Sequence, residues 1–391
     1  MNNFVFENTT KVYFGKKCVK EYLTCLLKKY SPGNTIMLAY GRNSIKKNKI
    51  YDEIITILKS SGNTIVEFPN IMQNPTYEKV LEGAALAREK NVDFILGVGG
   101  GSVMDCSKAI AMAAVSKEDI WDNFYSKSNI LNFDPIPLGV IDTTAGSGSE
   151  CNGYAAITNE KLKIKTGQDY SKCNPKFALL APDYTYSVPI KQMVAGSFSI
   201  LSQIMETYFS RPNEDNVSDD ISEALIKNII RNLKTAVQNS KDYTARSNLL
   251  WDSAMGENHI IRLGKNVNQQ CRQIGYQLSA YTNCKHGHSL AVIQPAYYYH
   301  LYPFELSKFV RFAENIWNVS AINKTKEETA LAGIKAFSDF IKEIGLPVTL
   351  RELGMKDTAV LEEISASCEI PSSNRNVLTN KEILNILKKC F

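Results

Sequence analysis

Apolar and polar positions follow two different periods along the first half of the chain. Short apolar runs of strand length occur at residues 35–41, 63–70, 93–98 and 136–141. Longer stretches with apolar residues three or four positions apart predict helices at residues 47–62, 74–92 and 103–116, the second with Thr76 as its N-cap. Strands that alternate with helices are typical of a parallel sheet wrapped by helices, so we expect an α/β domain here.

The pattern changes character near residue 189. Beyond it, amphipathic helical patterns dominate, at residues 192–210, 218–238, 330–345 and 379–390. The sequence therefore predicts an α/β domain of residues 1–189 and an all-helical domain of residues 190–391.

Composition narrows the class of protein. The 391 residues include 45 basic and 40 acidic ones, and the resulting net charge of +5 is too small to indicate a nucleic-acid surface. No apolar run reaches the roughly 18 residues of a membrane span, and the first residues lack the pattern of a signal peptide. Nine dispersed cysteines without a CxxC pair fit reduced thiols. We expect a cytoplasmic protein that binds neither membranes nor nucleic acid.

A glycine-rich loop follows the apolar run at residues 93–98. In "ILGVGGGSVMDCSK", Gly99, Gly100 and Gly101 allow a tight turn and a close approach to a ligand. Ser102 then lies near the start of a predicted helix, where free N–H groups and the helix dipole favour a phosphate. The alternative is a tight strand-to-helix turn that binds nothing.

The loop "GRNSIKK" at residues 41–47 follows another predicted strand. In a nucleotide fold such a loop can meet the adenosine ribose. Beside Gly41, the side chains of Arg42, Ser44 and Lys46 suit a 2′-phosphate, and no carboxylate is present to accept from a free 2′-hydroxyl. The loop favours NADP(H) over NAD(H), and the alternative is a solvated basic turn.

A third loop, "DTTAGSGSECNG" at residues 142–153, is by itself no more than a small polar loop after an apolar run. Together with "GVGGGSVMDCSKAIA", "PDYTYSVP" and "KHGHSLAVIQPA", however, it resembles the iron-containing alcohol dehydrogenase family, nearest its butanol dehydrogenase branch. The motifs stand in family order from about residue 14 to residue 300. The resemblance implies a doubly wound, Rossmann-like N-terminal nucleotide domain and a helical C-terminal domain that holds a divalent metal.

The resemblance also assigns cofactor-binding residues. It implies that Gly99, Gly100, Gly101 and Ser102 form the pyrophosphate loop, and that the other contacts come from Asp105, Thr143, Thr144, Ser147 and Lys165.

Of the family's four metal ligands, one Asp and three His, three are replaced in this chain and only the fourth, His286, is kept. The four matching positions are held by Ser199, Gln203, Tyr276 and His286. A hydroxyl and an amide are poor substitutes for a carboxylate and an imidazole around iron or zinc, so we expect no tight metal site. The alternative is an improvised site that uses His288 and Cys284 beside His286.

These observations predict an oxidoreductase that acts on an alcohol, aldehyde or ketone with NAD(P)H. Without the metal, a hydrogen-bond donor has to stabilise the developing alkoxide, and Tyr276 and His286 are our candidates. Metal-free maleylacetate reductases in the same superfamily make such chemistry reasonable. The alternative is an inactive cofactor-binding member with a regulatory or partner role. The family implies a homodimer, and "KVYFG" at residues 11–15 fits an interface strand.

Overall fold

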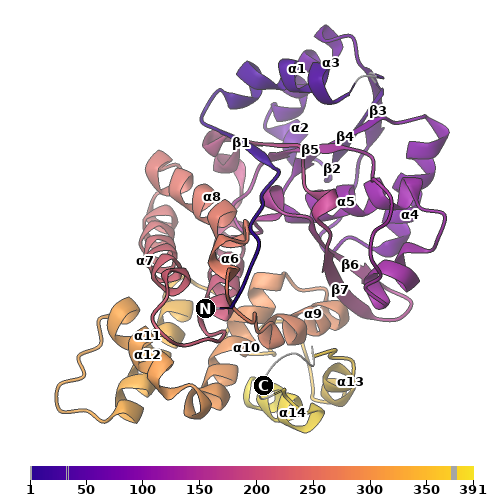
Figure 1. Cartoon of the computed structure of the whole chain (residues 1–391). Helices are drawn as coiled ribbons and strands as arrows, with labels where there is room; N and C mark the ends of the chain where they lie inside the picture. Colours follow the sequence, from indigo (N-terminus) through magenta and orange to yellow (C-terminus); the bar gives the residue numbers. More distant parts are fainter. Residues whose placement is uncertain (1, 32, 34, 371–376) are drawn as a thin grey trace. The chain divides into compact units, whose positions relative to one another are not determined.

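The computed structural model describes residues 2–31, 33, 35–370 and 377–391, and its chain forms two compact units (Figure 1). The α/β unit contains Glu7–Pro189 and Ser240–Asn258, and the helical unit contains Met1–Phe6, Ile190–Asn239 and His259–Phe391. The chain passes from one unit to the other at residue 190, next to the predicted boundary. Residues 240–258 depart from the prediction, because this segment packs on a loop of the α/β unit.

The α/β unit is built on a parallel sheet with the strand order β1-β8-β5-β4-β2-β3. Its strands are β1 (Lys11–Phe14), β2 (Thr35–Tyr40), β3 (Thr64–Phe68), β4 (Phe94–Gly99), β5 (Leu138–Asp142) and β8 (Phe177–Leu180). The central strands are apolar because both of their faces are buried. Strand β1 lies at one edge of the sheet. Its role in a dimer interface stays a prediction.

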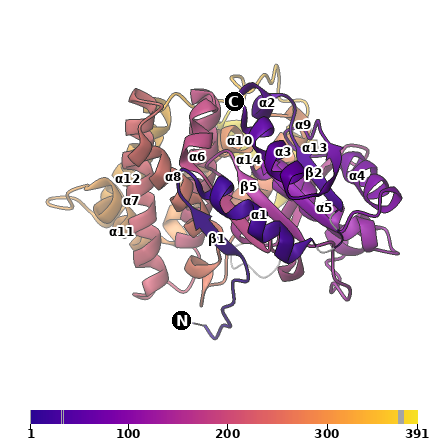
Figure 2. The same cartoon turned by 90° about the horizontal axis from the view of Figure 1, so that it is seen from above.

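Helices cover both faces of this sheet. On one face α1 (Cys18–Tyr30), α2 (Ser44–Lys47) and α3 (Ile50–Ser60) pack on alternate residues such as Leu38 and Leu96. The other face packs through Met37 and Ile95 against α4 (Tyr77–Glu89) and α5 (Gly101–Val115), as Figures 1 and 2 show. The doubly wound fold is confirmed, and so is the Thr76 N-cap, whose side chain accepts from the Lys79 amide at 3.2 Å.

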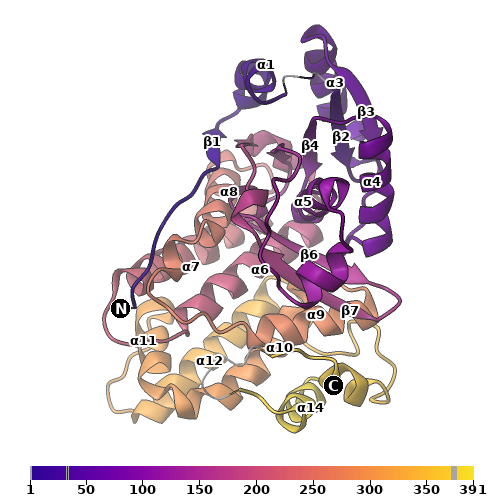
Figure 3. The same ribbon diagram turned by 45° about the vertical axis from the view of Figure 1, so that its right-hand side comes forward.

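A small antiparallel hairpin adds to the unit beyond the predicted pattern. It consists of β6 (Tyr154–Asn159) and β7 (Ile164–Asp169). Helix α5 packs against both β4 and β6, so it lies between the sheet and the hairpin (Figure 3). The hairpin that follows the loop at residues 142–153 therefore packs against α5.

The helical unit contains all the long helices after residue 189 except α8 (Tyr243–Glu257), which belongs to the α/β unit. Its helices are α6 (Ile190–Tyr208), α7 (Val217–Gln238), α9 (Gln270–Thr282), α10 (His286–Leu301), α11 (Leu306–Trp317), α12 (Lys326–Glu343), α13 (Leu361–Ala366) and α14 (Asn380–Lys389). Figure 2 shows α7, α11 and α12 side by side. The rings of Phe209 after α6, Tyr298 on α10, and Phe309 and Phe312 on α11 pack together in the core of this unit.

Within the described ranges, no helix combines the length and the apolar character needed to cross a membrane.

Candidate functional site

Three of the predicted cofactor loops start at the same edge of the sheet. Strands β2, β4 and β5 are neighbours and run parallel, with Tyr40 beside Val98 and Gly99 beside Asp142. Their carboxyl ends therefore release the loops at residues 41–47, 99–102 and 143–149 close together. The strand order also reverses between β2 and β4, and such switch points are where open α/β sheets bind ligands.

Glycines in the second loop permit close contact with the third. A Cβ added at Gly100 would lie 2.5 Å from the Thr144 hydroxyl, and one added at Gly101 would lie 2.5 Å from the Ser147 Cβ. The glycines are thus required by contact between two loops, a reason that the sequence did not reveal. Helix α5 begins at Gly101, and the N–H groups at its start suit a pyrophosphate.

The backbone ties the same two loops together. The Thr143 amide donates to the Gly99 carbonyl at 3.1 Å, and the Thr144 amide donates to the Asp142 carboxylate at 2.8 Å. Thr143 is buried, whereas Thr144 and Ser147 are partly exposed. The predicted residues of the two loops therefore form one surface.

Asp105 supports this surface from the first turns of α5. Its carboxylate accepts from the Ser149 hydroxyl at 2.6 Å and from the Ala156 amide at 3.2 Å. Burial raises the pKa of Asp105, while the nearby Lys108 and Lys165 ammonium groups act in the opposite direction. Asp105 is held by the loop at residues 142–153 and by β6, so its side chain positions the loop.

Two lysines complete this support. The Lys108 ammonium is buried and donates to the Ser149 carbonyl at 2.6 Å and to the Tyr154 carbonyl at 2.9 Å. Lys165 is also buried and donates to the Asn74 side chain at 2.7 Å. Its positive charge acts to lower the pKa of Asp105.

Ser253 of α8 is a functional candidate that the sequence did not indicate. Its hydroxyl accepts from the Gly146 and Gly148 amides, both at 3.0 Å. Gly148 adopts a φ of +64°, and a Cβ there would lie 2.7 Å from the Ser253 carbonyl oxygen. The serine thus fixes the loop from a helix more than a hundred residues away in the chain. No local sequence motif predicts this contact.

Glu150 is a fully buried carboxyl within the same loop. In the described part of the chain neither of its carboxylate oxygens has a hydrogen-bond partner. Burial raises the pKa of Glu150 to about 7, with Glu257 and Asp105 adding to the effect. Burial, and after it the charge of Glu150, also raises the pKa of the neighbouring Asp142.

We therefore predict that Glu150→Gln changes the pH dependence of stability. The folded state holds its proton more tightly than the unfolded chain, so stability falls as pH rises from 4.5 towards about 7. Relative to the parent, the variant should gain roughly 2 to 3 kcal/mol in free energy of unfolding between about pH 5 and about pH 8. Urea denaturation measures this gain, with the exposed Glu160→Gln as control. A difference that stays constant with pH would contradict it.

The basic loop after β2 is only partly available to a ligand. Arg42 and Ser44 are exposed, but the Lys46 ammonium lies over the rings of Tyr40 and Tyr51, at 5.3 Å and 4.7 Å from their centroids. A methyl group at Gly41 would meet only ordinary contacts, so packing alone does not require this glycine.

A carboxylate lies beside this loop on β3. Glu67 accepts from the Tyr40 and Tyr51 hydroxyls at 2.6 Å and 2.7 Å. Its pKa is lowered mainly by the Tyr40 hydrogen bond and further by the Lys46 charge. Because Lys46 lies over two rings and beside Glu67, Arg42 and Ser44 are the predicted side chains that remain exposed to bind a 2′-phosphate.

The residues that the family resemblance places at the metal-ligand positions come from three helices of the helical unit. Ser199 and Gln203 lie one turn apart on α6, and the Gln203 amide nitrogen donates to the Ser199 hydroxyl at 3.1 Å. The Gln203 carbonyl oxygen accepts from the guanidinium of Arg272 on α9 at 3.0 Å. Both ends of the amide are thus engaged, and these side chains are buried.

Tyr276 and His286 also lie together. Their ring centroids are 4.6 Å apart, and Tyr276 is 5% exposed. His286 opens α10, whose next residue, Gly287, packs so closely on α6 that a methyl group would overlap the Ala195 carbonyl oxygen. The "HG" pair thus brings the start of α10 against α6.

These residues do not fit a divalent metal. The carboxylate position is a serine, the amide at Gln203 is held by Ser199 and Arg272, and a guanidinium adds positive charge nearby. Across the residues that the structure describes, no three His, Cys, Asp or Glu side chains are grouped as a metal site requires. We therefore assign no chemical step to a metal.

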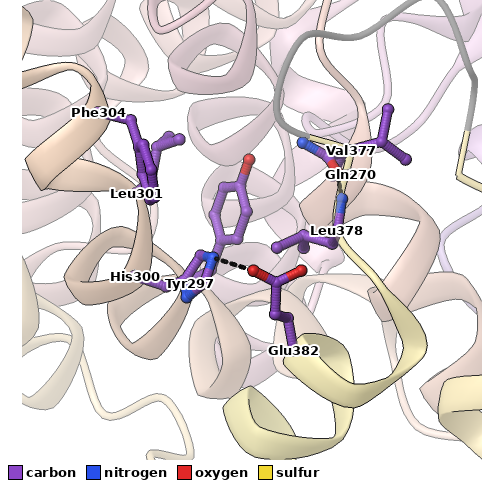
Figure 4. Close-up of a pocket in the computed structure, with 8 residues that line it drawn as sticks. All are labelled: Gln270, Tyr297, His300, Leu301, Phe304, Val377, Leu378 and Glu382. Atoms are coloured by element: carbon purple, nitrogen blue, oxygen red, sulfur yellow. Dashed lines mark hydrogen bonds and ion pairs between the residues drawn. The ribbon is translucent and has the colours of Figure 1, made fainter.

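A cavity of about 150 Å³ lies elsewhere in the helical unit (Figure 4). It is lined by Gln270, Tyr297, His300, Leu301, Phe304, Val377, Leu378 and Glu382. The His300 ring faces the Glu382 carboxylate at 3.6 Å, as the dashed line in Figure 4 marks. None of the predicted site residues lines this cavity.

Comparison with known proteins covers both units. The family model for "Iron-containing alcohol dehydrogenase" matches residues 9–182, and the C-terminal model for "Fe-containing alcohol dehydrogenase family" matches residues 193–391. The chain is 34% identical to NADH-dependent butanol dehydrogenase A of Clostridium acetobutylicum, with all of both chains covered. It is 29% identical to the NADPH-dependent aldehyde reductase YqhD of Escherichia coli, covering 92% of this chain and 91% of that one. The crystal structure of a Thermotoga maritima NADH-dependent butanol dehydrogenase A aligns with a TM-score of 0.93 at 32% identity, over 100% of this chain and 99% of that one.

Proposed function

Because this chain belongs to the iron-containing alcohol dehydrogenase family, we propose that it is an NADP(H)-linked oxidoreductase that interconverts a small alcohol and its aldehyde or ketone without a metal. The names of its relatives support the reaction class, since they include butanol dehydrogenases and an aldehyde reductase. A homodimer, expected from the resemblance, is part of the proposal.

The observation that carries the metal-free part is the state of Gln203. Its amide bonds to Ser199 on one side and to Arg272 on the other, where the family resemblance places a histidine ligand. The cofactor surface of the α/β unit, in contrast, keeps its glycines, its helix start and its two threonines. These features support binding of a nicotinamide nucleotide by the α/β unit, and the hydrogen bonds of Gln203 support a site without a metal.

The proposed reduction needs a hydride and a proton. A reduced nicotinamide nucleotide held by the loops after β2, β4 and β5 would supply the hydride to the carbonyl carbon, and side chains of this protein would have to supply the proton to the carbonyl oxygen. We assign the stabilising hydrogen bond to the Tyr276 phenol and the proton to His286, because their rings are in contact and both residues are chemically suited to donate. The developing alkoxide is the charge that these donors would stabilise.

The proposed preference for NADP(H) depends on the loop after β2. Exposed Arg42 and Ser44 suit a 2′-phosphate, whereas Lys46 is already engaged with aromatic rings. Relatives named for NADH and relatives named for NADPH are both found, so their names do not indicate which nucleotide this chain prefers. The proposed preference therefore depends on the residues of its own loop. The preference appears as a higher kcat/KM with NADPH than with NADH.

The test measures NADPH and NADH oxidation with short aldehydes and ketones, using chelator-treated protein with and without added Fe²⁺ or Zn²⁺. We expect turnover with NADPH that changes by less than about two-fold upon chelation, because the proposed donors are side chains. Turnover that requires added metal would contradict the metal-free proposal. NADPH binding without turnover of any substrate would favour the inactive cofactor-binding alternative.

A further inference from the structure

A buried guanidinium lies among the former ligand positions. Arg272 is 2% exposed, and its Nη2 donates to the Gln203 carbonyl oxygen at 3.0 Å. On α9 it precedes Tyr276 by four residues, so the two side chains project from the same side of the helix. Arg272 therefore contacts one former ligand position directly and lies one turn from another.

The charge of this guanidinium is balanced inside the protein. Its Nε lies 3.5 Å from the carboxylate of Glu206 on α6, and that carboxylate also accepts from the Arg272 backbone amide at 2.8 Å. Glu206 follows Gln203 by three residues on the same helix and is 4% exposed. A guanidinium does not lose its proton in proteins, so Arg272 remains a cation at this buried position.

We propose that Arg272 supplies the positive charge of this site and thereby keeps divalent metals out of it. A metal bound through residue 203 would lie close to the guanidinium, and two like charges in a buried site repel each other strongly. The pair also connects α6 to α9, two of the helices from which a metal would draw its ligands. The inference deepens the proposed metal-free function and rests on it.

The proposal predicts what happens when the family's metal ligands are restored by substitution. A triple variant, Ser199→Asp with Gln203→His and Tyr276→His, restores one Asp and three His together with the existing His286. It should still bind no metal, because the guanidinium remains. Adding Arg272→Gln should allow about one metal ion per chain, since a complete ligand set then stands without a competing cation.

Cobalt provides the readout, because tetrahedral Co²⁺ with nitrogen and oxygen ligands has visible absorption bands. Each variant is incubated with CoCl₂, desalted, and examined by absorption spectroscopy and elemental analysis. The matched control adds Lys285→Met to the triple variant, which removes a partly exposed cation next to His286. A second variant adds Arg272→Lys, which keeps the charge and should stay free of cobalt.

Cobalt in the quadruple variant alone supports the proposal. Cobalt in the triple variant, in the Lys285→Met control or in the Arg272→Lys variant overturns it, and so does its absence from a folded quadruple variant. If Arg272→Gln prevents folding, Glu206→Gln is added so that no unpaired carboxylate remains, and the same outcomes apply. The measurement is independent of turnover, so failure of the proposed activity and failure of this inference are distinguished.

Discussion

Replacing Gly101 with Ala is expected to weaken NADPH binding by about ten- to a hundred-fold while the protein stays folded. The added Cβ would lie 2.5 Å from the Ser147 Cβ, which belongs to the next loop along the sheet edge. A serine Cβ is fixed to the backbone and cannot rotate away, so the loop that carries Thr144 and Ser147 has to shift. Both loops would hold the cofactor, so their displacement weakens binding.

Isothermal titration with NADPH measures this loss, and a compensating change tests its cause. Ser147→Gly removes the atom with which the new methyl collides. We expect Ser147→Gly alone to cost only a few-fold, through its lost hydroxyl, and the double variant to bind like Ser147→Gly rather than with the product of both losses. If the two effects multiply instead, the contact between the loops is not the reason for Gly101.

Much of the proposed cofactor surface could be predicted because its signals are local. A buried strand, a run of glycines and the start of a helix occur within fifteen residues, and the sheet then aligns the carboxyl ends of β2, β4 and β5. The supporting Ser253 could not be predicted in this way, since it reaches Gly146 and Gly148 from α8. For the same reason the segment at residues 240–258 was placed in the wrong unit.

In the helical unit, burial obscured part of the pattern. Helix α10 is buried around most of its circumference, so its apolar residues show no helical period and the sequence pattern does not predict a helix there. Helix α9 buries polar residues such as Arg272 and Gln277, and residues of these types are mostly exposed in proteins. The sequence did not indicate that Arg272 contacts Gln203, because the two residues lie on different helices.

Tyr276→Phe is expected to lower kcat for aldehyde reduction by about a hundred- to a thousand-fold, with the NADPH dissociation constant unchanged within about two-fold. The substitution keeps the ring that contacts His286 and removes only the hydroxyl that would bond to the developing alkoxide. Because that hydroxyl belongs to the helical unit, cofactor binding by the α/β unit should persist. Single-turnover kinetics with NADPH and an aldehyde separate the chemical step from binding.

His286→Ala should produce a loss of similar size, because it removes the proposed proton source. The two losses should not multiply in the double variant, since both residues act on the same oxygen. Two matched controls are available in the same unit: Tyr281→Phe on α9, and His300→Asn, whose ring pairs with Glu382 at the separate cavity. Both controls should turn over like the parent. Normal turnover by Tyr276→Phe and His286→Ala would mean that other groups donate to the substrate oxygen, while cofactor binding by the loops after β2, β4 and β5 would stand unaffected.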